Sequence, residues 1–374
     1  MKNNKIWITT CLAAFSLGFV QKSEPTLKEA FQNSFYVGAA LNKAQFSGKD
    51  TKAQELVKKQ FNTISPENVL KWGPVHPKPE EYNFKPADDY VAFGQQNKMF
   101  IVGHTLVWHQ QTPDWVFEDE AGKPVSREVL LKRMENHIST VVGRYKGKIQ
   151  GWDVVNEAIA DQGGQMRPTK WLSIIGEDFA QKAFEYAHKA DPQAELYYND
   201  YSLYRPDKRE GVIRLVKSLQ AKGIKVKAIG MQGHYGLTVP TMEQVEASIV
   251  AFSKLGVEVN FTELDIDVLP NPSQRQGADI AETFDADQKF NVYSSGLPDS
   301  VQQKLTKRYA DLFTLFRKHQ DKIGRITFWG VTDANSWLNN WPIKGRTSYP
   351  LLFDRQYQPK PAYQAILNMA AQKK

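Results

Sequence analysis

Cysteine is almost absent from this sequence of 374 residues, which contains only Cys11. One thiol near the N-terminus excludes a disulfide framework and a metal site built on several thiolates. Cys11 lies inside an apolar stretch rather than at its end, which disfavours a lipid-modified cysteine. If that stretch is removed, the remaining chain also lacks a cysteine nucleophile.

Long hydrophobic runs are lacking as well, apart from residues 6–20. That run is short for a bilayer-spanning helix, which needs about 20 apolar residues. Lys2 and Lys5 precede it and polar residues follow it, which is the order of an export signal. We expect residues 1–22 to be this signal, cleaved near residues 18–24. Residues 23–374 would then form a protein exported to the periplasm or out of the cell, with no membrane anchor.

Motifs of several common site classes are missing too. No G-x-G-x-x-G or G-x-x-x-x-G-K-[ST] follows the first strand-like run, and neither G-x-S-x-G nor H-E-x-x-H occurs. The formal charge is +7 (48 − 41), but the basic residues are spread without a run, which indicates a solvated surface and no nucleic-acid partner. His104, His234 and Glu67 are the remaining candidates for a metal site. Their spacing matches no metal motif, so we expect neither a metal nor another cofactor.

The chain does contain a regular alternation of strand-like and helix-like runs. Helical periodicity is clearest in residues 129–145, and Asp50 and the pair Thr241 and Gln244 are helix-start signals. Eight such units without a nucleotide-binding loop, a linker or an internal repeat favour one α/β domain, a (β/α)8 or TIM barrel. The predicted strands are residues 35–41, 61–65, 100–103, 149–157, 195–198, 228–231, 257–261 and 325–328.

At least seven of the eight predicted strands end in polar or aromatic residues. One such residue is usually a helix cap or turn, but the carboxyl ends of barrel strands meet at one mouth, where active sites lie. These residues are Glu67 and Asn68, His104 and Trp108, Asn156 and Glu157, Asn199, Asp200 and Tyr201, Gln232 and His234, Glu263 and Asp265, and Trp329.

Two carboxyl groups stand out among them, Glu157 and Glu263. Cleavage of a glycosidic bond needs one carboxylic acid to protonate the leaving oxygen and one carboxylate on the other side of the sugar. Their environments must keep one protonated and the other ionised. Because side chains alternate along a strand, Glu263 and Asp265 should face the same way, with His234 between them. Asn156 and Glu157 cannot both face inward on a regular strand, so we expect a break or bulge there.

These residues form motifs that resemble those of glycoside hydrolase family 10, which are endo-β-1,4-xylanases on a (β/α)8 barrel. The resemblance runs from about Leu27 to the C-terminus, and the combination of motifs is highly specific. It implies hydrolysis of xylan and xylo-oligosaccharides. The motifs are E-N-V-L-K-W at 67–72, G-H-T-L-V-W-H at 103–109, W-D-V-V-N-E at 152–157, G-H at 233–234 and T-E-L-D at 262–265.

The resemblance also implies a role for each matching residue. Glu157 matches the general acid/base and Glu263 the nucleophile of a retaining double displacement. Asn156 matches the amide that binds the 2-hydroxyl of the cleaved sugar, and His234 and Asp265 match the pair behind the nucleophile. Tyr201 matches the aglycone side. The glycone side matches Glu67, Asn68, Lys71, His104, Trp108, Gln111, Gln232, Trp329 and Trp337.

Some features fall outside this pattern. Ser202 stands where the family often has Asn, which leaves the aglycone contacts open, and residues 270–295 form a long polar loop without a matching motif. We hypothesise that Trp337 crowds the position of the hydroxymethyl arm that glucose has and xylose lacks.

We expect the protein to be a monomer. Two other functions share some of these features. A barrel glycosidase for cellulose or mannan would share the two glutamates, but the motif at 67–72 and the pair Trp329 and Trp337 argue against it. A non-catalytic sugar-binding protein would have lost Glu157 or Glu263, and both are present.

Overall fold

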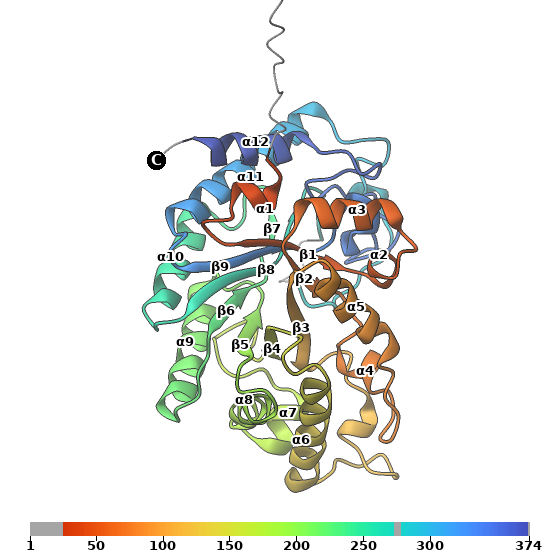
Figure 1. Cartoon of the computed structure of the whole chain (residues 1–374), viewed down its shortest axis with the longest axis vertical. Helices are drawn as coiled ribbons and strands as arrows, with labels where there is room; N and C mark the ends of the chain where they lie inside the picture. Colours follow the sequence, from red (N-terminus) through yellow and green to blue (C-terminus); the bar gives the residue numbers. More distant parts are fainter. Residues whose placement is uncertain (1–24, 273–277, 373–374) are drawn as a thin grey trace, which may run out of the picture.

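The structure is a computed structural model that describes residues 25–272 and 278–372. The predicted export signal, residues 1–22, lies outside the described residues. The described chain forms a ring of strands with helices packed around it (Figure 1). Its first described residues and its last helix, α12 (Pro361–Ala371), lie at the same end of the view.

Within the described residues, eight parallel strands close into a barrel, which confirms the predicted (β/α)8 class. Each barrel strand pairs with the next one along the chain, and β1 also pairs with β9, which closes the ring. The short β7 pairs only with the C-terminal part of β8, so β6 pairs directly with β8. The eight barrel strands are β1 (Tyr36–Leu41), β2 (Thr63–Pro66), β3 (Phe100–Val107), β4 (Gly151–Asn156), β5 (Glu195–Asp200), β6 (Ala228–Met231), β8 (Glu258–Asp267) and β9 (Ile323–Phe328). The additional short strand is β7 (His234–Gly236).

The helices surround this barrel and begin where local signals favour a start. Asp50 accepts a hydrogen bond from the Ala53 amide at 3.0 Å at the start of α3, and Thr241 and Gln244 form a capping box at the start of α10. In the described part of the chain, no helix is long and apolar enough to cross a membrane. The longer helices are α3 (Thr51–Gln60), α5 (Lys85–Gln96), α6 (Arg127–Arg144), α8 (Phe179–Ala190), α9 (Pro206–Ala221), α10 (Met242–Ser253), α11 (Asp299–Lys318) and α12.

Shorter helices occupy the connections. They are α1 (Leu27–Ala30), α2 (Lys43–Phe46), α4 (Trp72–Val75) and α7 (Lys170–Ile175), with 3-10 turns at Asp114–Val116, Gln288–Phe290, Asp333–Asn335 and Trp337–Asn339. The predicted polar loop, residues 270–295, contains one of these turns and forms a bridge between Phe284 and Ile343.

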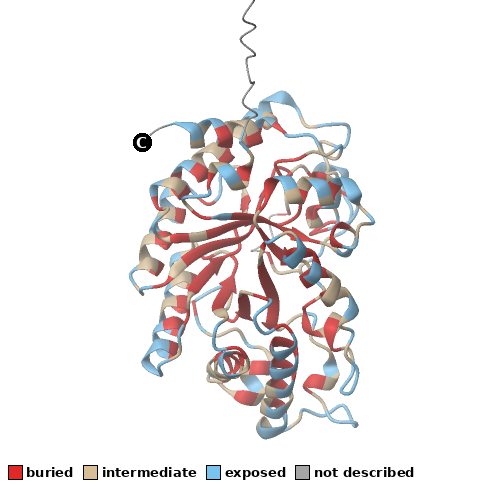
Figure 2. Ribbon diagram, viewed as in Figure 1, coloured by how far each residue is buried: buried red, intermediate tan, exposed pale blue. Residues whose placement is uncertain are grey.

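Buried residues concentrate on the strands and on the inward faces of the helices (Figure 2). In α6 they are Leu130, Met134, Ile138 and Val141, the stripe that helical periodicity predicts. Packing between neighbouring strands is tight enough to require a glycine at one position: a Cβ on Gly103 of β3 would lie 2.1 Å from the indole ring of Trp152 on β4. The large ring on one strand therefore needs the missing side chain on its neighbour.

Several barrel strands run further than the apolar pattern predicts. The predicted ends of β3, β5 and β8 are wrong, because these strands continue through His104, through Asn199 and Asp200, and through Glu263 and Asp265. A polar side chain that finds hydrogen-bond partners inside the mouth does not end a strand, although it ends an apolar run.

The predicted irregularity at Asn156 and Glu157 is confirmed. Strand β4 ends at Asn156, and Glu157 adopts the left-handed conformation with φ of +58°. The pairing of β4 with β5 also shifts register between Asp153 and Val155. Similar shifts occur in β3 after His104 and in β8 after Phe261. These shifts re-aim side chains at the carboxyl ends of the strands, where the candidate site lies.

Candidate active site

All the predicted site residues except Tyr201 and Asp265 line one cleft of about 400 Å³ at the carboxyl ends of the strands. The cleft is also lined by Ala278, Ile280 and Asn335, which the sequence did not indicate. The members that were predicted are Glu67, Asn68, Lys71, His104, Trp108, Gln111, Asn156, Glu157, Gln232, His234, Glu263, Trp329 and Trp337.

Glu157 is buried at the end of β4 and is held by several donors. Trp108 Nε1 donates to its Oε2 at 2.7 Å, and Gln232 Nε2 donates to its Oε1 at 2.9 Å. The Asn156 amide also approaches Oε1 at 3.2 Å. Burial, together with the negative charge of Asp200, raises the pKa of Glu157 to about 7 against the effect of these hydrogen bonds. Near neutral pH this carboxyl group is therefore able to carry a proton.

Glu263, on β8, is held in the opposite state. Burial alone would raise its pKa, but a hydrogen bond from His234, the nearby histidine charges and a hydrogen bond from Asn199 together lower it below its ordinary value. His234 Nε2 lies 3.2 Å from Glu263 Oε2 and its Nδ1 lies 3.0 Å from Asp265 Oδ1. The predicted arrangement, with His234 between Glu263 and Asp265, is confirmed.

His234 is able to serve both carboxylates because it is charged. Burial disfavours its charge, but the two carboxylates overcome this effect, Asp265 more than Glu263, and raise the pKa of His234 to about 10. Asp265 lies behind the cleft, where its Oδ2 accepts a hydrogen bond from Trp337 Nε1 at 2.7 Å. The carboxylate of Glu263 is therefore ionised and fixed in orientation.

Asn199 connects Glu263 with Asn156, and no role was predicted for it. Its Nδ2 donates to Glu263 Oε1 at 2.8 Å and to Asn156 Oδ1 at 3.0 Å. Thr262 Oγ1 in turn donates to Asn199 Oδ1 at 2.6 Å. Its position beside Asp200 at the end of a predicted strand was the available signal, but no motif separated it from its neighbours.

The cleft also contains a second acid beside a lysine, Glu67 and Lys71. Burial raises the pKa of Glu67 to about 7, although the positive charge of Lys71 opposes this rise. Lys71 Nζ donates to Asn68 Oδ1 at 3.2 Å and lies 4.9 Å from the ring centre of Trp108. Gln111 Nε2 reaches the same Asn68 oxygen at 3.5 Å. These groups offer hydrogen-bond donors and acceptors suited to sugar hydroxyls.

Aromatic rings form the remaining wall. Trp337 stacks on Trp341 with ring centres 4.3 Å apart, and it lies 4.8 Å from the ring of His234. Trp329 meets the ring of His104 edge-on at 5.6 Å. Flat indole faces beside polar groups are typical of sites that bind carbohydrates, because they contact the apolar faces of sugar rings.

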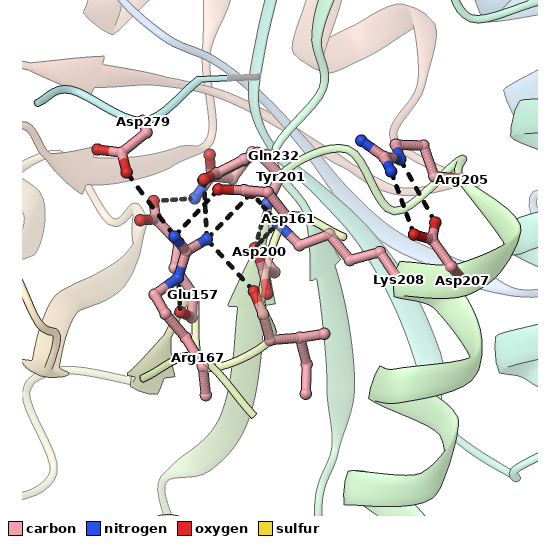
Figure 3. A network of polar contacts seen from close by, with 12 residues as sticks. Glu157, Asp161, Arg167, Asp200, Tyr201, Arg205, Asp207, Lys208, Gln232 and Asp279 are labelled. Atoms are coloured by element: carbon pink, nitrogen blue, oxygen red, sulfur yellow. Dashed lines mark hydrogen bonds and ion pairs between the residues drawn. The ribbon is translucent and has the colours of Figure 1, made fainter. Parts of the chain in front are cut away.

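Tyr201 does not line the cleft in this structure. Its side chain is only 1% exposed and packs with Ala278, Leu338 and Trp341, while its hydroxyl accepts a hydrogen bond from Arg167 Nη2 at 2.8 Å. Figure 3 shows it inside a network of charged side chains next to Glu157. Contact between Tyr201 and an aglycone sugar stays a prediction.

The site does not present a metal-binding set. Across residues 25–272 and 278–372, no group of three or more histidine, cysteine, aspartate and glutamate side chains is arranged to hold a metal ion. Both nitrogens of His234 face carboxylates, and His104 Nδ1 lies 2.9 Å from Asp153 Oδ2. What the arrangement offers is acid, base and nucleophile chemistry by two carboxyl groups in different protonation states.

Comparisons with known proteins agree with this chemistry. The sequence pattern of glycosyl hydrolase family 10 matches residues 26–369. "Endo-1,4-beta-xylanase A" of Xylanibacter ruminicola is 46% identical over 358 residues, covering 96% of this chain and 97% of that protein. "Endo-1,4-beta-xylanase" of Geobacillus stearothermophilus is 42% identical over 352 residues, covering 93% of this chain and 99% of that protein.

Solved structures give the same result. A family 10 endoxylanase from a sugarcane soil metagenome superposes with a TM-score of 0.87 at 43% identity, covering 92% of this chain and 99% of that one. Xylanase XynB from Paenibacillus barcinonensis, in complex with a conduramine derivative, gives a TM-score of 0.83 at 42% identity, covering 92% and 98%. The chain therefore belongs to glycosyl hydrolase family 10 and is a glycoside hydrolase.

Proposed function

We propose that this protein is an endo-1,4-β-xylanase that cleaves internal bonds of xylan with retention of anomeric configuration. The observation that carries the proposal is the opposite shift of two carboxyl pKa values in one cleft, raised to about 7 for Glu157 and lowered for Glu263. The relatives named endo-1,4-beta-xylanase, which align over nearly their whole length, support xylan as the substrate.

The first step forms a glycosyl-enzyme intermediate. A carboxylate oxygen of Glu263 attacks the anomeric carbon, the bond from that carbon to the bridging oxygen breaks, and the departing oxygen takes the proton of Glu157. In the second step Glu157, now ionised, accepts a proton from water as the water oxygen attacks the same carbon and Glu263 leaves. Asn156 is in position to donate to a hydroxyl of the sugar being cleaved, since its amide lies beside Glu157 Oε1.

The roles of the two glutamates are tested by azide rescue. Glu263→Ala should abolish hydrolysis of xylan, and azide should restore turnover of an activated aryl xylobioside as the α-glycosyl azide. Glu157→Ala should lower the rate on xylan by roughly 10²–10⁴-fold, the usual contribution of acid/base help, and azide should give the β-glycosyl azide. The products are identified by NMR, with Glu55→Ala on the surface of α3 as the control.

Two results would reject this assignment. A β-azide from Glu263→Ala would mean that this residue is not the nucleophile, and a loss below about tenfold on xylan in Glu157→Ala would remove it as the acid. Reducing-sugar release from xylan, glucomannan and soluble cellulose, measured side by side, decides the substrate class.

Export and a monomeric state belong to the same proposal. The order of charges and apolar residues in residues 1–22 supports export to the periplasm or the medium. Only four large apolar side chains are strongly exposed among the described residues, Tyr36, Val129, Val239 and Val292, and so small a number is what we expect of a monomer. Cell fractionation and sedimentation analysis test these two points.

A further inference from the structure

Arg167, in the loop between β4 and α7, is nearly buried behind Glu157 and uses most of its guanidinium donors. Its Nε donates to the carbonyl oxygen of Glu157 at 3.0 Å, and its Nη2 donates to the carbonyl oxygen of Ile159 at 3.3 Å. Nη1 and Nη2 of the guanidinium also donate to the two carboxylate oxygens of Asp161, each at 3.1 Å. Its side chain is 11% exposed. Figure 3 shows Arg167 within this network of polar contacts. Arg167 therefore hydrogen-bonds to the main chain of the proposed acid and of a residue just after it.

The segment that Arg167 contacts has a backbone conformation that other contacts must stabilise. Glu157 is a non-glycine residue with φ of +58°, a conformation that costs free energy unless surrounding contacts impose it. Its amide N–H donates to the Asn199 carbonyl at 2.9 Å, and its carbonyl accepts from Arg167. Both backbone polar groups of Glu157 are thus fixed by residues from other parts of the chain. The direction of its side chain follows from this backbone conformation.

The next peptide is fixed from the side of β5. The Ala158 amide donates to Tyr198 Oη at 3.0 Å, and Tyr198 Oη donates to Asp200 at 2.6 Å. The backbone N–H of Arg167 donates to the Ala158 carbonyl at 2.7 Å. Glu157 and the residue after it are therefore clamped between β5 and Arg167.

A buried lysine completes the network. Lys208 on α9 is fully buried, and its Nζ lies 2.9 Å from Asp200 and 3.2 Å from Asp161. Arg167 also approaches Asp279 at 3.7 Å from the loop 270–295. Both cations contact Asp161, and the guanidinium of Arg167 also contacts the carbonyl groups of Glu157 and Ile159. A lysine at position 167 would keep the positive charge but lacks the planar fork that contacts all of these groups together.

We infer that Arg167 is a positioning residue, which acts through the backbone of Glu157 to hold its carboxyl group at the leaving oxygen. The inference rests on the proposed role of Glu157 as the acid. Arg167 is not among the residues that line the cleft, and its contact with Glu157 is to the backbone carbonyl. The alternative is that Arg167 only stabilises its loop. The two roles differ in whether the loss of kcat/KM depends on how strongly the leaving group needs protonation.

The experiment compares Arg167→Lys with wild type on two aryl β-xylobiosides. A phenol leaving group needs protonation, whereas 2,4-dinitrophenol departs without it. We expect Arg167→Lys to lower kcat/KM for the phenyl substrate by about 10- to 100-fold, less than the roughly 10²–10⁴-fold that acid/base help contributes in full, because the acid is misplaced but still present. For the dinitrophenyl substrate we expect a loss of less than about threefold. Glu157→Ala should give the same pattern with a larger loss.

Arg214→Lys is the matched control. Arg214 Nη2 donates to the Gly164 carbonyl at 2.7 Å in the same loop but does not contact Glu157. We expect kcat/KM of this variant to stay within about twofold of wild type on both substrates. Thermal unfolding of all variants shows whether each is folded at the assay temperature, and the lysine variant is chosen because it keeps a cation beside Asp161.

A double variant makes the test sharper. If Arg167 acts only through Glu157, Arg167→Lys should change kcat/KM by less than about twofold when it is added to Glu157→Ala. An equal loss on both aryl substrates, or the same loss with and without Glu157, would overturn the inference and leave a structural role. If Glu157→Ala itself lacked leaving-group dependence, the proposed acid would be rejected along with it. That outcome is distinguishable, because it appears in Glu157→Ala alone.

Discussion

At the scale of single residues, the reaction depends on the protonation states of Glu157 and Glu263. Glu157 must be protonated and Glu263 ionised for the first step. Burial and Asp200 raise the pKa of Glu157 to about 7, so its proton is lost as the pH rises through 7. The pKa of Glu263 is lowered, so it becomes protonated only below the ordinary range of a glutamate.

We therefore expect kcat/KM on xylan to fall as the pH rises through about 7, and on the acid side to fall only below about 4.5. The measurement is the pH dependence of kcat/KM. Glu67→Gln is the control, because burial raises the pKa of Glu67 to about 7 as well. If the alkaline limb disappears in this variant, it belongs to Glu67. An alkaline limb above pH 9 in the wild type would contradict the assignment to Glu157.

Trp337 offers a second prediction at this scale, on the choice between xylose and glucose units. It lines the cleft, stacks on Trp341 and donates to Asp265. Trp337→Ala should open space for a hydroxymethyl arm and lower the ratio of xylan to soluble-cellulose hydrolysis by about tenfold, the effect of a small group in a pocket. Trp337→Phe keeps a ring but lacks the N–H, so it separates crowding from the lost hydrogen bond. An unchanged ratio in Trp337→Ala would refute the hypothesis.

At the scale of elements, apolar runs and helical periodicity were enough to predict the type and order of the barrel strands and main helices. The start signal at Asp50 is confirmed, because Asp50 is the N-cap of α3. The ends of β3 and β8 could not be predicted, because an inward-facing His104 or Glu263 looks like the end of an apolar run. The short strand β7 was not predicted for a different reason, because three residues are too few to show a periodic pattern.

The same limit applies to side chains that reach the site from loops. Arg167 lies in a polar stretch without periodicity, and its contact with Asp279 joins residues 112 positions apart (279 − 167). Ala278 and Ile280 line the cleft from a loop that carries no motif. The family resemblance predicted thirteen of the residues that line the cleft, but only the fold shows that Tyr201 packs against Ala278.

At the scale of the whole molecule, the two ends of the described chain meet where the barrel closes. Helix α12 packs against α1 and α11. Gln60, at the end of α3, accepts hydrogen bonds at Oε1 from the Leu27 amide at 3.1 Å and from Tyr363 Oη at 3.2 Å. The first and last helices are thus tied to each other beside β1 and β9, the strands that complete the ring.

We expect this closure to contribute to the stability of the whole barrel. Ile366 on α12 is fully buried and lies outside the cleft. Ile366→Ala should lower the free energy of unfolding by about 2–5 kcal/mol, through lost burial and the cavity left behind, and should leave kcat on xylan at 25 °C within about twofold of wild type. Urea unfolding followed by tryptophan fluorescence measures the first quantity. Asn368→Ala, on the exposed face of the same helix, should change it by less than about 0.5 kcal/mol. A loss below about 1 kcal/mol in Ile366→Ala would mean that α12 unfolds separately, because a cavity in a cooperative unit weakens all of it.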